Sequence, residues 1–117
     1  MRELAVLPNP TRIERDAAIQ RFEYSFEAAW KAAQRFLRVI EGVEVGSPKA
    51  AVRACRESGL LSREQAETAL TMADDRNLTA HTYNESLAVA IFNRLPRHLE
   101  TLEAWLAAMT DRIVRTR

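Results

Sequence analysis

The sequence has few of the residues that stabilise small extracellular or metal-binding proteins. Its one cysteine, Cys55, excludes an intramolecular disulfide and agrees with a cytoplasmic location, where thiols stay reduced. Ala51, Val52 and Ala54 surround Cys55, which predicts a small core residue. One cysteine and two histidines offer no zinc-site spacing, so we predict no metal site and no other cofactor. Hydrophobic runs are too short to cross a membrane, and we expect no membrane partner.

Glycine and proline are scarce as well, and neither sign of charge dominates. With three glycines and four prolines in 117 residues, and with helix-forming residues abundant, the sequence predicts an all-α fold. Its 47% hydrophobic residues suffice for one small core, so we expect one domain. The net charge of +1 gives no overall electrostatic signal for nucleic acid. Arginine supplies fifteen of the 17 cations; it suits phosphate contacts, but a GC-rich genome explains most of this bias.

A long first helix is predicted to begin at Asn9–Pro10, or at the capping box Thr11–Glu14, and to end at Gly42. Tyr24 and Trp30 lie off its main apolar seam. They form a second apolar face, which for a long helix in a small protein predicts a partner. The seam residues recur at alternating steps of three and four, as in a heptad repeat: Ile19, Phe22, Phe26, Ala29, Ala33, Phe36 and Ile40.

Two further helices are predicted from their caps. Ser47–Pro48 is an N-cap followed by proline at the first helical position, and Gly59 ends that helix. Ser62–Gln65 is a second capping box, from which a third helix runs to Asn77. Residues 79–83 are predicted to be the frayed end of this helix or a turn.

The last helical region follows Asn84, which is predicted to cap it. Pro96 should kink or break this helix near Arg94, because proline cannot donate a backbone hydrogen bond. His98 lies beside the apolar stripe without other polar residues near it, and we predict it at the boundary or the surface. The stripe consists of Leu87, Ile91, Leu95, Leu99, Leu102, Leu106, Met109 and Ile113.

Together these elements predict an all-α, up-and-down four-helix bundle with one helix kinked or split. We expect residues 9–115 to form this single domain. Residues 1–8 have no helix cap and end in a proline, which predicts a flexible arm.

A polar motif of four residues lies within eight positions of the chain. It combines the fixed cation of Arg76, the amide of Asn77, the imidazole of His81 and the phenol of Tyr83. On a continuous helix, Arg76 and His81 point about 140° apart, on different faces. To serve one site, the helix must end between them, or two chains must combine their side chains. A helix C-terminus with a satisfied histidine and solvated charges is the alternative interpretation.

Three stretches, in this order, resemble the HEPN-domain family in its small prokaryotic branch encoded beside minimal nucleotidyltransferases. They are the first-helix motif Ala18–Lys31, the segment Ser47–Leu61 with its Ser-Pro start and Gly-Leu-Leu end, and the Arg-x4-His-x-Tyr motif Arg76–Tyr83. They follow one another in the family's order, and the resemblance extends over most of residues 13–109. The resemblance implies a bundle similar to the helical C-terminal domain of kanamycin nucleotidyltransferase.

The residues and the resemblance together predict a metal-independent ribonuclease that acts on RNA. His81 takes the proton of a ribose 2′-OH, and Arg76 stabilises the charge on the phosphorus transition state, held by Asn77. Asp74 and Asp75 flank Arg76 and are expected to offset part of its charge. In HEPN ribonucleases these motif residues meet across a homodimer, so the resemblance implies a homodimer here.

The resemblance also implies a toxin–antitoxin pair, in which a cognate minimal nucleotidyltransferase transfers AMP onto Tyr83 and so neutralises the ribonuclease. In the alternative reading, the chain is a non-catalytic subunit that binds a nucleotide or substrate for a separate nucleotidyltransferase. Trp30 and Lys31 then help to line the binding cleft. A third reading is a bundle whose polar motif only stabilises a dimer.

Overall fold

Helices make up most of the chain, and the computed structural model describes residues 5, 9–81 and 84–116, without the side chains of residues 80 and 81. They are α2 (Arg12–Phe36), the π-helical turn η1 (Leu37–Glu41), α3 (Pro48–Glu57), α4 (Arg63–His81) and α5 (Glu85–Thr116). No strand occurs in these ranges, which confirms the all-α prediction. None of the helices described is long and apolar enough to cross a bilayer.

The helices begin where the sequence places their caps. Thr11 and Glu14 form a capping box, in which the Thr11 hydroxyl accepts from the Glu14 N–H and the Glu14 carboxylate accepts from the Thr11 N–H. Ser47, Ser62 and Asn84 each accept a backbone N–H three residues ahead, at 3.1–3.2 Å. Each of these side chains satisfies an N–H that has no partner within its own helix.

The first helix ends at Gly42 as predicted, but it does so through η1, which the sequence does not predict. Gly42 has φ +69°, in the left-handed region that favours glycine. The N–H of Val43 then donates to the C=O of Leu37 at 2.9 Å and closes the end of the helix.

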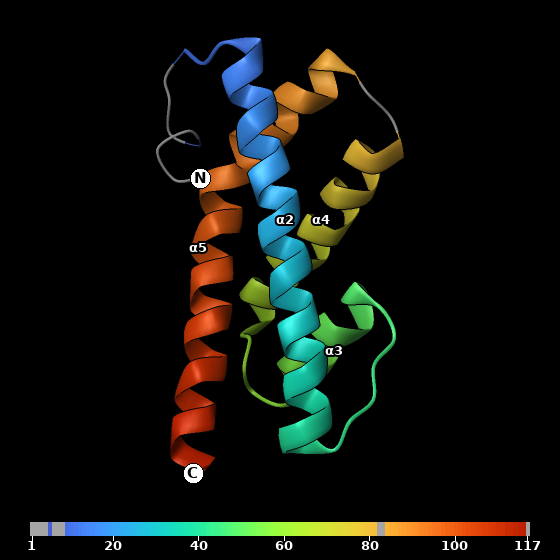
Figure 1. Cartoon of the computed structure of the whole chain (residues 1–117), viewed down its shortest axis with the longest axis vertical. Coiled ribbons are helices and arrows are strands. Elements are labelled where there is room, and N and C mark those ends of the chain that lie inside the picture. The colour runs from blue at the N-terminus through green and yellow to red at the C-terminus, as the bar shows by residue number, and fades with distance from the viewer. Residues whose placement is uncertain (1–4, 6–8, 82–83, 117) are drawn as a thin grey trace.

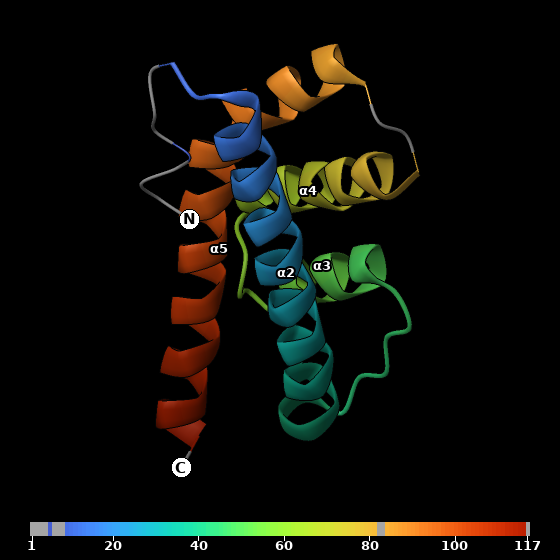
Figure 2. The same cartoon turned by 45° about the horizontal axis from the view of Figure 1, so that its top comes forward.

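The two longest helices, α2 and α5, lie side by side and run in the same direction (Figure 1). Arg15 of α2 is bonded to Glu85 at the start of α5, and Glu41 to Arg112 near its end. The shorter α3 and α4 lie on one side of this pair and are inclined to it (Figure 2). α5 bends in its N-terminal part but is not split. Pro96 inside it lacks the N–H for a helical bond, which accounts for the predicted kink.

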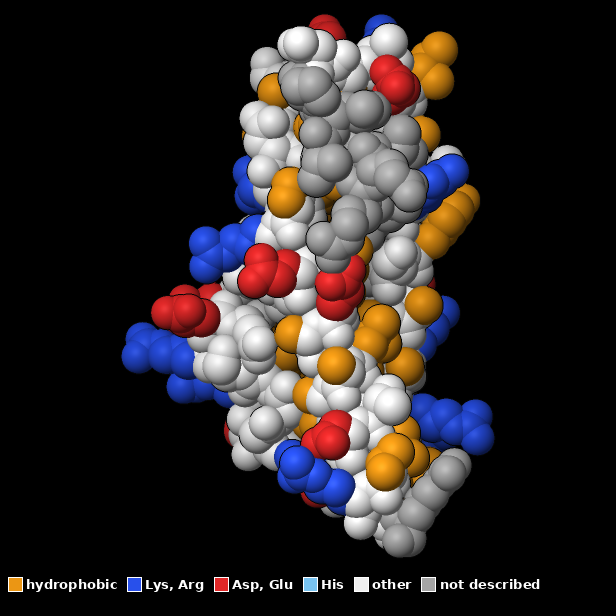
Figure 3. All heavy atoms as spheres, turned by 90° about the vertical axis from the view of Figure 1, so that its left-hand side faces the viewer, with side chains coloured by type: hydrophobic (Ala, Val, Ile, Leu, Met, Phe, Trp, Pro, Cys, Tyr) orange, Lys and Arg blue, Asp and Glu red, His pale blue; other side chains and the backbone are white. Residues whose placement is uncertain are grey.

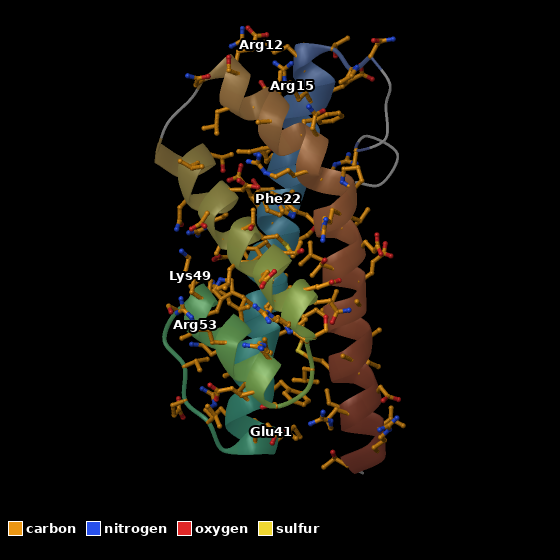
Figure 4. All side chains as sticks on the ribbon, turned by 180° about the vertical axis from the view of Figure 1, so that it is seen from behind. Arg12, Arg15, Phe22, Glu41, Lys49 and Arg53 are labelled. Atoms are coloured by element: carbon orange, nitrogen blue, oxygen red, sulfur yellow. The ribbon has the colours of Figure 1, made fainter. Side chains whose placement is uncertain are left out.

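The core lies between α2, α4 and α5, where Phe22 points inward (Figure 4). The predicted seam of α2 is buried there, except for the half-buried Ile40, and Cys55 is buried as predicted. The predicted stripe of α5 is wrong at Leu106 and Ile113, which are exposed. The buried seam of α5 instead steps by four and three through Ile91, Leu95, His98, Leu102, Trp105 and Met109.

The helical bundle predicted from the sequence is therefore confirmed. The domain limits at residues 9 and 115 stay a prediction. The flexible arm predicted at residues 1–8 falls outside the described residues, except for Ala5, which is buried.

Candidate functional site

The helix α4 carries Arg76, Asn77 and His81 of the polar motif and is helical as far as His81. The sequence predicts a frayed end or a turn over residues 79–83; in the structure residues 79–81 are helical, so of the two conditions for a shared site only the combination of two chains remains. The backbone of one chain thus sends these two residues about 140° apart around the helix. The side chain of His81 and the whole of Tyr83 lie outside the described residues.

Arg76 reaches from α4 to α2, where it forms an ion pair with Glu27. Its Nη2 atom lies 3.1 and 3.3 Å from the two carboxylate oxygens, and the side chains of Arg76 and Glu27 are 37% and 28% exposed. Asn77 Oδ1 accepts a hydrogen bond from Arg76 Nη1 at 3.4 Å. The structure thus brings Arg76 and Asn77 together, and it adds Glu27, which the sequence does not single out.

The two aspartates before Arg76 are paired with other cations, and that they offset part of its charge stays a prediction. Asp74 is paired with Lys49 of α3 at 2.6 Å, and Asp75 is turned into the protein interior. Consecutive helical residues point about 100° apart, so neighbours in the sequence face different elements.

Of the two residues predicted to line a binding cleft, one belongs to the Arg76 site. Trp30 is half-buried against the core, and its indole N–H donates to Glu27 Oε1 at 2.9 Å. Glu27 therefore links Trp30 to Arg76. Lys31 is exposed on α2, and no hydrogen bond or ion pair with the described residues connects it to this site.

A second polar cluster lies between α4 and α5 and consists of the buried Asp75 and His98 and the partly exposed Arg94. Arg94 donates to both Asp75 oxygens, at 2.7 and 3.0 Å, and His98 Nε2 lies 2.8 Å from Asp75 Oδ2. Asp75 and His98 are each 2% exposed. The imidazole stacks on Phe22 of α2, with ring centroids 5.3 Å apart. The surface position predicted for His98 is wrong.

A positional signal for this cluster does exist in the sequence. His98 lies three residues after Leu95 and four before Leu102, so it is in register with the buried seam of α5. Arg94 is one helical turn before His98, on the same side. What the sequence cannot supply is Asp75, the partner on another helix that makes burial of these polar groups tolerable.

Asp75 and Arg94 each favour the charged form of the other. Burial acts to raise the pKa of Asp75, but the hydrogen bonds from His98 and Arg94 outweigh it and lower that pKa. The hydrogen bond to Asp75 likewise raises the pKa of Arg94. Because a carboxylate only accepts, His98 Nε2 carries the proton, and the buried Nδ1 has no partner among the described residues.

A pocket of about 210 Å³ lies beside the C-terminal part of the motif, between α2 and α5. Asp16 and Glu23 give it two carboxylates, and Thr79 and Asn84 bring it next to the motif. Its apolar wall is formed by Ile19, Leu87 and Ala88. Among the described residues, no group of three or more His, Cys, Asp or Glu side chains is placed to hold a metal ion.

These features define a small all-helical protein with a polar site on an exposed part of α4. Residues 3–111 match the model of the family described as "nucleotidyltransferase substrate binding protein like", so the chain belongs to that family. The crystal structure of a protein from Thermus thermophilus is similar, with 57% identity and a TM-score of 0.88 over 92% of this chain and 91% of that one. The search of curated proteins finds no match.

Proposed function

We propose that this chain is a HEPN-type, metal-independent ribonuclease that works as a homodimer beside a separate nucleotidyltransferase. Its family supports the connection with nucleotidyltransferases. The observation that carries the proposal is the position of Arg76, a partly exposed guanidinium on α4 with Asn77 bonded to it. A guanidinium that keeps donors at the surface is suited to a phosphate oxygen.

The proposed reaction uses the 2′-OH of RNA as the nucleophile. His81 accepts the 2′-OH proton, and the 2′ oxygen attacks the adjacent phosphorus. The bond from phosphorus to the 5′ oxygen breaks, and that oxygen takes up a proton to leave as a 5′-OH. Arg76 stabilises the negative charge that builds up on the phosphoryl oxygens, and Asn77 holds the guanidinium. The products are a 2′,3′-cyclic phosphate and a 5′-hydroxyl end.

The continuity of α4 supports a homodimer. One chain directs Arg76 and His81 to different faces of the helix, so the two side chains meet only if each copy supplies one of them. The exposed face of α2 gives such a dimer apolar surface, because Ile13 and Tyr24 lie eleven residues apart, which is close to three full turns.

Regulation is proposed at Tyr83. The phenol oxygen attacks the α-phosphorus of ATP on the partner nucleotidyltransferase, pyrophosphate leaves, and Tyr83 carries AMP through a phosphodiester. The added negative charge and bulk then oppose RNA phosphate near Arg76. Mass spectrometry should find one or more AMP units on the peptide that contains Tyr83.

A second candidate function is favoured by the ion pair between Arg76 and Glu27. This pair neutralises the guanidinium in the free chain, which suits a binding surface better than charge stabilisation in a transition state. In this role the chain binds a nucleotide or substrate for the nucleotidyltransferase and performs no chemistry. Trp30, joined to Glu27, and the neighbouring Lys31 border that surface, and the pocket near Asn84 offers a cavity.

Incubation of the purified protein with labelled RNA in EDTA decides between the two. Ribonuclease activity predicts cleavage without metal, cyclic-phosphate or 3′-phosphate ends, and loss of cleavage in both Arg76→Ala and His81→Ala. Arg38→Ala, an exposed arginine of η1, serves as the control and should cleave like the parent. Cleavage that needs Mg²⁺, or that persists in both motif variants, would contradict the assigned roles. Nucleotide binding without cleavage would support the second candidate.

A further inference from the structure

A stripe of cations runs along α3 toward the motif on α4. Lys49, Arg53 and Arg56 are spaced i, i+4 and i+7, which places them on one side of the helix over about 10 Å. Lys49 and Arg53 lie one above the other on the side of α3 (Figure 4). We call these three residues the α3 stripe. No proposed step of the ribonuclease reaction uses them.

The stripe reaches α4 at Asp74, which points about 200° around the helix from Arg76. Lys49 Nζ lies 2.6 Å from Asp74 Oδ1, and Asp74 is two residues before Arg76 on α4. At the other end, Arg53 and Arg56 border a groove of about 790 Å³ between α3 and α4. The cations thus continue from this groove to the side of α4 that carries Asp74.

The two arginines of the stripe keep their charge available. Arg53 and Arg56 are exposed, and neither has a hydrogen bond or ion pair in the part of the chain that the structure describes. The acids Glu57 and Glu67 also line the groove, but Glu67 is already paired with Arg63 at 3.3 Å. The groove therefore offers guanidinium donors to an incoming anion, with Glu57 as the opposing charge.

The composition of the groove favours a phosphate backbone over a protein. Of its apolar lining residues, Val52 and Ala66 are only 0% and 4% exposed and Leu70 is half-buried, so a docking protein would bury little additional apolar surface there. None of the described residues that line the groove is aromatic, so they offer no stacking with nucleotide bases. Charge is the main interaction that remains, and bidentate contact with phosphate is what arginine provides best.

We propose that the α3 stripe binds the phosphate backbone of the single-stranded RNA substrate. This proposal rests on the proposed ribonuclease function and names how its substrate is held. Since only phosphates are contacted, the binding is independent of sequence and weakens as the salt concentration rises.

The test is a salt titration of RNA affinity, measured by fluorescence anisotropy with a labelled single-stranded RNA. Every protein carries His81→Ala, so that the RNA stays intact. The double variant Arg53→Gln/Arg56→Gln should bind more weakly, with a log–log salt slope reduced by about 1.4, because each phosphate contact in single strands contributes about 0.7. Glu57→Gln removes the opposing charge and should tighten binding.

Arg38→Gln/Arg115→Gln is the matched control, since it removes two exposed arginines elsewhere and should leave the slope unchanged. Equal slopes in the stripe variant and its parent would overturn the stripe while leaving the ribonuclease function standing. An intact protein that does not bind RNA would overturn both. If the stripe variant keeps its RNA affinity but loses binding to a nucleotidyltransferase, the stripe is a protein interface and the proposal is wrong.

Discussion

Asp75 is the residue on which the junction of three helices depends. Its carboxylate accepts from Arg94 and His98 of α5, and His98 packs on Phe22 of α2. Removing the carboxylate leaves a buried imidazole N–H and part of a guanidinium without an acceptor. A buried charge pair that loses one partner costs more than the pair itself contributes, because the remaining polar group stays desolvated.

We therefore expect Asp75→Ala to lower the free energy of unfolding by about 3 kcal/mol. The neighbouring Asp74→Ala is a matched control, because Asp74 and Lys49 are largely exposed and such a pair contributes about 0–1 kcal/mol. Urea denaturation followed by circular dichroism measures both. Equal losses in the two variants would show that Asp75 has no special structural role.

The Asp75 carboxylate should also make the free energy of unfolding depend on pH in the acid range. The pKa of Asp75 is lower in the folded protein than in the unfolded chain, where it is about 3.9. The stability from this charge is fully present above the unfolded pKa and is lost as pH falls through the folded pKa. Asp75→Asn should therefore flatten the acid limb of the stability curve below about pH 4. Urea midpoints from neutral to acid pH test this, and an unchanged acid limb would contradict it.

Glu27 controls the charge that Arg76 presents. Its carboxylate accepts from Nη2 of the guanidinium, so a ligand anion competes with it for that donor and for the charge of Arg76. Glu27→Gln should tighten RNA binding a few-fold, consistent with the modest strength of a partly exposed ion pair. Glu44→Gln, an exposed loop residue, is the control. Weaker binding in Glu27→Gln would mean that Glu27 positions Arg76 rather than competing for it.

At the scale of the helices, the end of the first helix depends on backbone conformation. Gly42 has φ +69° and nothing within 4 Å of an added Cβ atom, so an alanine there meets conformational strain without a clash. Gly46 lies four residues on, has equally open surroundings and no positive φ. Gly42→Ala should cost about 1–2 kcal/mol of folding stability, and Gly46→Ala much less. Thermal unfolding of the two variants measures this difference.

The helices also show which features local sequence can predict. The caps at Thr11, Ser47 and Ser62 were predictable because each depends on residues within one turn. For His98 the register of the α5 seam gives a positional signal, but its partner Asp75 lies on another helix and was not predictable. The partner of Arg76 was missed for the same reason: Glu27 lies 49 residues away in the sequence. Local patterns thus give the bundle and the motif, while contacts between helices decide what the motif residues touch.

At the scale of the whole molecule, the exposed apolar side chains are scattered over more than one face. On the side where α5 faces the viewer, hydrophobic side chains stand in several separate groups, with Lys and Arg mostly toward the edges (Figure 3).

On α2, Tyr24 is 67% exposed, and its hydroxyl accepts from Gln20 at 3.1 Å. Because Ile13 and Tyr24 are both strongly exposed on α2, we expect the second copy to bind at this face of α2. Light scattering of the parent and of Tyr24→Glu should show a dimer and a monomer, respectively. A parent that is monomeric at micromolar concentration would contradict the dimer.

An active site shared between two chains predicts complementation between inactive variants, which dimerisation alone does not. If each site takes Arg76 from one copy and His81 from the other, Arg76→Ala and His81→Ala are both inactive alone but complement each other when mixed. Random exchange puts half of the chains into mixed dimers, and each mixed dimer has one intact site of two, so about a quarter of the parent activity should return. Subunit exchange is verified beforehand by energy transfer between labelled copies. Exchange without any return of activity would place both side chains in the same chain, which the continuous α4 helix makes geometrically unfavourable.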